Sequence, residues 1–338
     1  MKWSYSLIGT LLINSTVLAT EPFATLMSQQ VVPFWLQLKP QQLTLSDGSS
    51  LPYMLIKPEA VKATVVLVNG RTESYLKYQQ LAYELVQQGY QVLMFDHRGQ
   101  GLSKRLTDNV YKGHIEDFQQ YVDDMHQLIS RIILPGNHLP LYLLGHSMGG
   151  AISTLYLEQH PDVFQKAALS APMLGIQGKL LYDEQDACRL ASVVSVFTSQ
   201  GYAGFADKPY QPAPFSSNDL TGSAERYQWN LELYQSHPEI QLGGATWGWL
   251  DQACTVLPKI QQQAKNIKIP LLLMQAELDS IVSASAQQSF CSVLAGNAKL
   301  GCVGGVQVIK GAQHELLFEQ EGIRQSVIDK IVAHFSEN

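Results

Sequence analysis

The sequence predicts an α/β protein with a mostly parallel sheet and helices on both faces. Short apolar runs such as 64–68 and 141–144 have the composition of strands that are buried on both sides. Segments with apolar residues at helical spacing, such as 75–88 and 118–132, alternate with these strands. This alternation implies right-handed crossovers. At 338 residues, 46% of them hydrophobic, the chain can bury a large core.

The expected elements follow one another in a regular order. The first is a hairpin that pairs residues 41–45 with 52–56 across the turn-forming Asp47-Gly48. The alternation then runs through strand 64–68, helix 75–88, strand 91–95, helix 118–132, strand 141–144 with the helix after it, and strand 166–169. It resumes with strand 270–274, helix 284–294, strand 306–309 and helix 323–335.

Between these blocks, from about Pro172 to Leu250, the alternation stops. Gly, Pro, Gln and aromatic residues occur there in irregular order. A subdomain inserted into one α/β sheet is the simplest explanation. We therefore predict a core formed by residues 30–172 and 250–338, with residues 173–249 inserted as a lid.

The first 19 residues have the features of a secretory signal peptide. Lys2 supplies a weak positive charge, residues 6–18 are mostly apolar, and Val17-Leu18-Ala19 matches the small-residue cleavage pattern. The apolar stretch is short and interrupted, which disfavours a transmembrane helix. We expect export to the periplasm or the medium. The alternative is an uncleaved segment that anchors the protein in a membrane.

The four cysteines are consistent with an exported protein. An even number suggests disulfides. Cys291 and Cys302 flank a short polar loop and are expected to pair, which leaves Cys188 with Cys254. The alternative is four reduced and buried cysteines.

The most informative motif is Gly145-His146-Ser147-Met148-Gly149, which follows an apolar strand and precedes a helix. Gly-x-Ser-x-Gly in this context is typical of a nucleophile elbow, a tight turn that presents one serine hydroxyl above the sheet. The glycines leave room where a Cβ would obstruct the turn. Ser147 is therefore the predicted nucleophile, and the lid lies where it could cover this serine. The alternative is an ordinary glycine-rich turn.

A serine nucleophile requires a base and a carboxylate that orients the base. In α/β-hydrolases the chain order is serine, acid, histidine. Of the nine histidines, His314 lies in a loop directly after the last predicted strand, where the base is expected. Asp279 and Glu277 both follow strand 270–274, and we favour Asp279 as the acid because it lies deeper in the loop. His314 is not part of a zinc motif, since the second histidine is lacking.

The oxyanion donors are expected to be two backbone amides. One is the N–H of Met148 and the other is the N–H of Arg71, in the loop after strand 64–68. The Arg71 side chain could meet a substrate phosphate, but a surface ion pair with Glu73 is favoured. Residues 96–101 (DHRGQG) are a weak match to a phosphate-binding loop and are interpreted as structural support for the active-site loops.

Four segments resemble the bacterial lysophospholipase L2 branch of the monoacylglycerol-lipase-like α/β-hydrolases: 69–75 (NGRTESY), 96–101 (DHRGQG), 145–150 (GHSMGG) and 311–315 (GAQHE). The similarity extends over about residues 38–336. It implies an eight-stranded α/β-hydrolase fold with a lid, no cofactor, and Ser147, Asp279 and His314 as the triad. Many relatives have histidine where Asn69 stands, so no role is assigned to that side chain.

These observations predict a serine esterase that forms an acyl-enzyme. The resemblance favours hydrolysis of a lysophospholipid or a monoacylglycerol with release of a fatty acid. Alternatives are a general short-chain carboxylesterase and a non-catalytic lipid-binding protein. Trp229, Trp247 and Trp249 are expected either to line an acyl-chain pocket or to form the core of the lid.

The expected partner is a small lipid or ester, and no protein partner is implied. The net charge of −6 and the lack of a basic run disfavour nucleic-acid binding. Contact with a membrane or micelle surface is expected to be apolar and transient.

Overall fold

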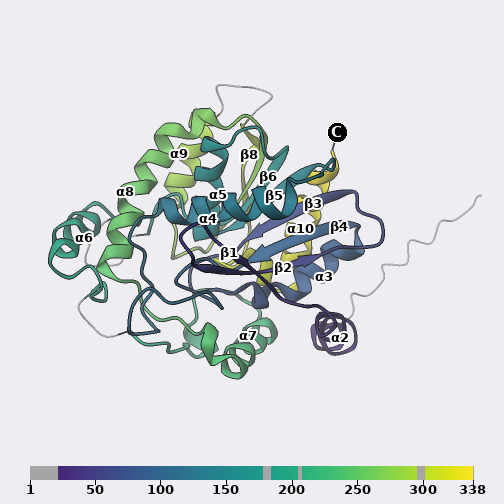
Figure 1. The fold of residues 1–338 in the computed structure, drawn as a ribbon, viewed down its shortest axis with the longest axis horizontal. Helices are drawn as coiled ribbons and strands as arrows, with labels where there is room; N and C mark the ends of the chain where they lie inside the picture. The colour runs from purple at the N-terminus through teal and green to yellow at the C-terminus, as the bar shows by residue number, and fades with distance from the viewer. Residues whose placement is uncertain (1–21, 178–183, 205–207, 295–300, 338) are drawn as a thin grey trace, which may run out of the picture.

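The computed structural model describes residues 22–177, 184–204, 208–294 and 301–337. Their centre is one eight-stranded sheet in the order β1-β2-β4-β3-β5-β6-β7-β8 (Figure 1). The strands are β1 (Gln41–Thr44), β2 (Ser50–Ile56), β3 (Ala63–Val68), β4 (Tyr90–Phe95), β5 (Leu141–His146), β6 (Lys166–Ser170), β7 (Pro270–Ala276) and β8 (Gly301–Ile309). The predicted signal peptide, residues 1–19, lies outside the described residues.

Strand direction follows the predicted pattern. The hairpin strands β1 and β2 pair antiparallel, β2 pairs antiparallel with β4, and the remaining pairs are parallel. Every residue of the apolar strand β3 is buried. The carboxyl ends of β3, β5 and β6 are in register, with Val68 opposite Gly145 and His146 opposite Ser170. The loops after these strands therefore meet at one edge of the sheet, where ligand sites of open α/β sheets lie.

Two helical layers cover the sheet, as the alternation predicted (Figure 1). One face packs against α4, α5, α8 and α9, and the other against η2, α3 and α10. The bounds of these helices are η2 (Tyr75–Tyr78), α3 (Gln79–Gln87), α4 (Gln119–Leu128) continued by η3 (Ile129–Ile133), α5 (Met148–Gln159), α8 (Trp247–Gln263), α9 (Ala284–Leu294) and α10 (Glu321–Ser336). The helix expected at 75–88 thus begins with a 3-10 turn, in which the Ser74 hydroxyl accepts from the N–H of Leu76.

The segment between β6 and β7 contains helices that the sequence patterns did not predict. They are α6 (Glu184–Thr198), η4 (Phe215–Ser217), α7 (Ala224–Ser236), η5 (Pro238–Ile240) and α8, with η6 (Ala264–Asn266) after it. Ser223 caps α7 and Thr246 caps α8, since each side chain accepts a hydrogen bond from a first-turn amide. Helix α8 crosses the expected lid boundary at residue 249 and packs on α5.

The amino-terminal helices were also not predicted. They are α1 (Phe23–Leu26), η1 (Met27–Val31) and α2 (Val32–Trp35). These helices pack along α3 and α7. A further 3-10 turn, η7 (Leu316–Phe318), precedes α10. Among the helices of the described residues, none has the length and apolarity needed to cross a bilayer.

Both predicted disulfides are present. Cys188–Cys254 joins α6 to α8, and Cys291–Cys302 joins α9 to β8. The alternative of four reduced cysteines is therefore excluded.

Candidate active site

The turn between β5 and α5 has the geometry of a nucleophile elbow. Ser147 has φ 52° and ψ −121°, a strained conformation for a residue with a side chain. Four backbone hydrogen bonds hold it. Its N–H donates to Ser170 O at 3.1 Å, and its carbonyl accepts from Gly150 N at 2.8 Å, from Met173 N at 2.9 Å and from Ala151 N at 3.3 Å. A Cβ on Gly149 would lie 2.1 Å from a carbonyl oxygen of β3, so only glycine fits there.

The structure brings the three predicted side chains together. Ser147 Oγ lies 2.9 Å from His314 Nε2, and His314 Nδ1 lies 2.8 Å from Asp279 Oδ2. Ser147 is only 8% exposed and His314 only 4%. An ionised carboxylate on Nδ1 requires a proton on that nitrogen, which leaves Nε2 free to accept the serine proton.

The second oxygen of Asp279 is also held. Oδ1 accepts hydrogen bonds from Ile281 N at 2.8 Å and Val282 N at 3.1 Å. Burial alone would raise the pKa of this carboxyl, but the bonds from His314 and the two amides outweigh it and lower the pKa. The competing candidate, Glu277, is exposed and accepts from Gly311 N, so it braces the His314 loop without touching the histidine.

The loop after β3 is fixed by side chains from the 96–101 segment, as predicted. Gln100 Nε2 donates to the carbonyl of Gly70 at 2.7 Å and to that of Glu73 at 3.0 Å. Asp96 accepts from Ser74 Oγ, from Tyr75 N and from the side chain of Asn69. The Asn69 amide is therefore engaged with the supporting loop.

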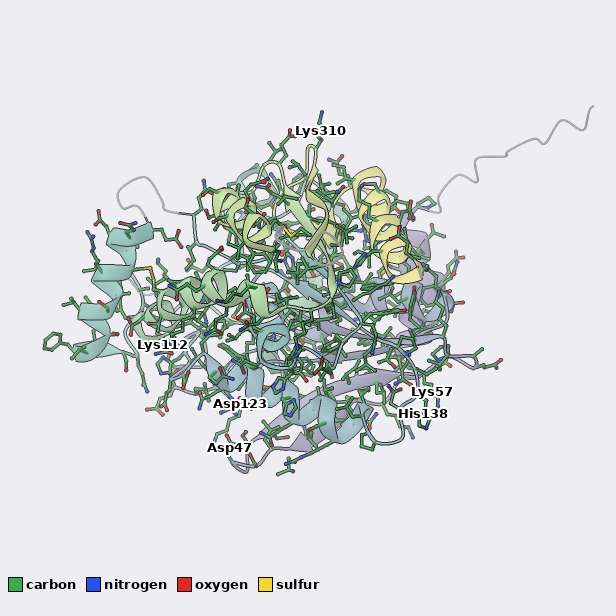
Figure 2. All side chains as sticks on the ribbon, turned by 90° about the horizontal axis from the view of Figure 1, so that it is seen from above. Asp47, Lys57, Lys112, Asp123, His138 and Lys310 are labelled. Atoms are coloured by element: carbon green, nitrogen blue, oxygen red, sulfur yellow. A yellow bond between two sulfur atoms is a disulfide. The ribbon has the colours of Figure 1, made fainter. Side chains whose placement is uncertain are left out.

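A buried group of three charges lies beside this loop, which the sequence patterns did not reveal. Lys77 Nζ contacts Glu73 Oε1 at 2.6 Å and Glu315 Oε1 at 2.5 Å. Glu73 Oε2 also accepts from Gly70 N and from Tyr78 Oη, both at 2.5 Å. Burial would raise the pKa of Glu73, but Lys77 lowers it to about 2. Most other charges lie at the surface, as Lys57, Asp123 and Lys310 do in Figure 2.

This arrangement corrects the expectation for Arg71. Because Glu73 is engaged with Lys77, Arg71 does not form the predicted ion pair with it. Arg71 Nη2 instead donates to Gly243 O at 2.9 Å, and the guanidinium carbon lies 5.1 Å from the ring centroid of Trp249. The side chain thus points toward the β6–β7 segment.

A cavity opens at Ser147, and a larger cavity adjoins it. The smaller, about 340 Å³, is lined by Ser147, His314, Arg71 and Trp249 among others. The larger, about 640 Å³, lies under the β6–β7 segment and shares several lining residues with the first, including Glu315. Together they have the size of a site for a lipid-sized ligand.

The three candidate tryptophans have different environments. Trp249 lines the smaller cavity. Trp229 packs edge-on against the amino-terminal Phe23, with ring centroids 6.5 Å apart, and Trp247 is buried in the first turn of α8. Neither Trp229 nor Trp247 is among the residues that line the two cavities, so these cavities do not support a pocket role for them.

The fold and the position of the serine define an α/β-hydrolase, and the chain is a hydrolase of the serine type. The sequence profile described as serine aminopeptidase, S33, matches residues 59–321, and the chain belongs to that family. It is 36% identical over 319 residues to lysophospholipase L2 of Escherichia coli (strain K12). This alignment covers 94% of this chain and 93% of that protein. It is 25% identical to the Homo sapiens monoglyceride lipase, covering 86% and 88%.

Among solved structures, a soluble variant of the Saccharomyces cerevisiae monoglyceride lipase with a substrate analogue superimposes with a TM-score of 0.69. The identity is 18%, and the match covers 88% of this chain and 95% of the yeast chain. The similarity at this low identity concerns the fold, and it covers most of the chain.

Proposed function

We propose that the protein cleaves the acyl ester of a lysophospholipid or a monoacylglycerol, with Ser147 as nucleophile, His314 as base and Asp279 as the residue that orients the base. The observation that carries this proposal is the unbroken hydrogen-bond chain Asp279–His314–Ser147 at the wall of a cavity. A serine held in this way can lose its proton as it attacks a carbonyl carbon.

The reaction has two halves. In the first, Ser147 Oγ attacks the ester carbonyl carbon and passes its proton to His314 Nε2, and the histidine then protonates the leaving alcohol oxygen as the ester bond breaks. The acyl group is now bound to Ser147. In the second half a water attacks this acyl-enzyme, its proton goes to His314, and the histidine returns a proton to Ser147 Oγ as the fatty acid leaves. Asp279 stabilises the imidazolium in both halves.

We assign the oxyanion donors to the backbone N–H groups of Met148 and Arg71. Met148 is the first residue of α5, and amides in a first helical turn have no intrahelical acceptor. The carbonyl of Gly70 is held by Gln100, and in a trans peptide the next N–H points the opposite way. Gly70 and Arg71 line the cavity that contains Ser147, which supports an inward-pointing Arg71 N–H.

The substrate assignment rests on the relatives and on the cavities. The relatives named lysophospholipase L2 and monoglyceride lipase align along most of this chain. We propose that residues 173–249 act as a lid, because residues such as Tyr210 and Tyr227 from this segment line the larger cavity. An acyl chain would extend from Ser147 between this lid and the sheet.

We also propose that the protein is exported and that residues 1–19 are removed. The two disulfides support this proposal, since such bonds persist in oxidising compartments.

A lipid panel with a Ser147→Ala control tests the function. Fatty-acid release is measured from lysophospholipid and monoacylglycerol of one chain length, and turnover from short and long p-nitrophenyl esters. We expect lipid hydrolysis that falls by about 10⁴-fold or more in Ser147→Ala. Unchanged activity in this variant would refute the role of Ser147. A steep preference for short esters would identify a short-chain carboxylesterase, and failure of a fluorophosphonate probe to label the protein would indicate a non-catalytic binder.

A further inference from the structure

Arg71 is a half-buried cation with a shielded Nε, and its hydrogen-bonding capacity is incompletely used. Its side chain donates from Nη2 to Gly243 O, while Nε has no hydrogen-bond partner among the residues that the structure describes. Burial lowers the pKa of the guanidinium to about 10, so it remains charged at neutral pH. A buried charge without a counter-ion is unfavourable, and native proteins usually pair such a group.

The other enclosed arginines of the described chain are satisfied. Arg98 pairs with Asp124, Arg226 with Glu321, and Arg324 with Glu84. Arg105 has no carboxylate partner, but its guanidinium donates to the carbonyls of Gly101, Ser103, Val110, Glu239 and Gln241. Arg71 pairs with no carboxylate among the described residues, and it donates to the carbonyl of Gly243 alone among them.

Two carboxylates line this cavity, and both are paired with Lys77 rather than with Arg71. Glu73 accepts from Lys77, Tyr78 and Gly70, and Glu315 accepts from Lys77. Among the described residues, none supplies an anion that completes the coordination of Arg71, and a bound ligand can supply one. The cavity that Arg71 shares with Ser147 is the route by which such an anion would arrive.

The position of the guanidinium is well defined. It lies against the ring of Trp249, a favourable cation–π arrangement. A Cβ at Gly113 would lie 2.8 Å from Arg71 Nη2, so that glycine leaves the space the guanidinium occupies. The side chain is thus held in one place before a ligand binds, which lowers the entropy cost of binding.

We propose that the Arg71 side chain binds the phosphodiester of the substrate, and that the protein therefore prefers a monoacyl glycerophospholipid to a neutral monoacylglycerol. This inference rests on the proposed function. A planar guanidinium matches phosphate geometry better than any other side chain. In a lysophospholipid only the three-carbon glycerol unit separates the scissile ester from the phosphate. One residue can therefore meet the ester with its backbone N–H and the phosphate with its side chain.

The test compares two substrates that differ in the phosphate. We measure kcat/KM for a 1-acyl lysophospholipid and for the 1-monoacylglycerol of the same chain length, with wild type, Arg71→Met and Arg71→Lys. The ratio of the two values should fall about 10- to 100-fold in Arg71→Met, and Arg71→Lys should retain part of the preference. Arg105→Met is the matched control, because that arginine binds only backbone carbonyls, and it should leave the ratio unchanged.

A second measurement needs no variant. Glycerophosphoethanolamine should inhibit short-ester hydrolysis by the wild type at concentrations at which glycerol does not. An unchanged substrate ratio in Arg71→Met, equal losses on both lipids, or equal inhibition by the two compounds would each overturn the inference while leaving the esterase intact. A wild type that cleaves neither lipid would instead refute the proposed function, and the inference with it.

Discussion

Replacing Lys77 with methionine should destabilise the protein strongly at neutral pH and much less in acid. Methionine retains the unbranched apolar stem as far as Cε but removes the ammonium that two buried carboxylates share. After the change Glu73 keeps its donors Gly70 N–H and Tyr78 O–H. Glu315 keeps none that the structure shows, because Oε2 is already without a partner and Oε1 loses Lys77.

The size of the stability loss in Lys77→Met follows from the proton that Glu315 must then bind. With an ordinary glutamic acid pKa of 4.5, protonation at pH 7.5 costs about 4 kcal/mol, and at pH 5.5 about 1.4 kcal/mol. The first value agrees with the 3–5 kcal/mol that breaking a buried ion pair typically costs. A carboxyl whose pKa rises on folding favours the folded state below pH 4.5 and loses that contribution as the pH increases. The penalty therefore grows with pH.

Urea unfolding followed by tryptophan fluorescence at pH 5.5 and 7.5 measures this penalty. The double variant Lys77→Met/Glu315→Gln should recover most of the stability at pH 7.5, because no carboxyl remains to be protonated. Lys62→Met, which removes an exposed lysine above the Tyr90 ring, is the surface control and should cost at most about 1 kcal/mol. A loss below 1 kcal/mol for Lys77→Met at pH 7.5, or equal losses at both pH values, would refute the reasoning.

Two further predictions concern buried polar side chains. Glu158 in α5 is 6% exposed, its carboxylate has no hydrogen-bond partner among the described residues, and burial raises its pKa to about 9. The free energy of unfolding of the wild type should therefore fall between pH 4.5 and 9 by up to about 1.4 kcal/mol per pH unit. In urea unfolding, the free energy of Glu158→Gln should depend less steeply on pH, and parallel pH profiles for the two proteins would contradict this. Gln100→Leu should lower kcat about 10- to 100-fold with little change in KM, because the Gly70–Arg71 peptide loses its anchor. Steady-state kinetics that show a change in KM alone would argue against that role.

The sheet and the three central site residues could be predicted because their signals are local. Apolar strands, the glycines around Ser147, and loops directly after strands are all short-range patterns. The position after the last strand then favoured His314, and the deeper position in the loop after strand 270–274 favoured Asp279 over Glu277. Helix α7 was missed because its apolar residues have no clear helical period. Helix α8 does have one, with Ala253, Val256, Leu257 and Ile260 buried on one face, but it begins inside the stretch that was interpreted as irregular.

The charged parts of the site could not be predicted in this way. Glu315 and Lys77 are 238 positions apart, so only the folded sheet brings them together. Arg71 and Glu73 are neighbours in sequence, yet the turn between them, with Thr72 at φ 64°, directs the two side chains to different partners. Sequence proximity suggested an ion pair that the loop conformation excludes.

The Cys188–Cys254 disulfide gives the candidate site a mechanical connection to the outer edge of the molecule. Helix α6 lies beyond α8 and exposes Val193, Val196 and Phe197, while α8 places Trp249 against Arg71 in the cavity wall (Figure 1). Because the covalent link prevents α6 from sliding along α8, a force on the exposed helix reaches the helix that shapes the cavity. After reduction of this one bond, noncovalent packing alone would hold α6 to α8, and the Asp279–His314–Ser147 hydrogen bonds involve no atom of that bond.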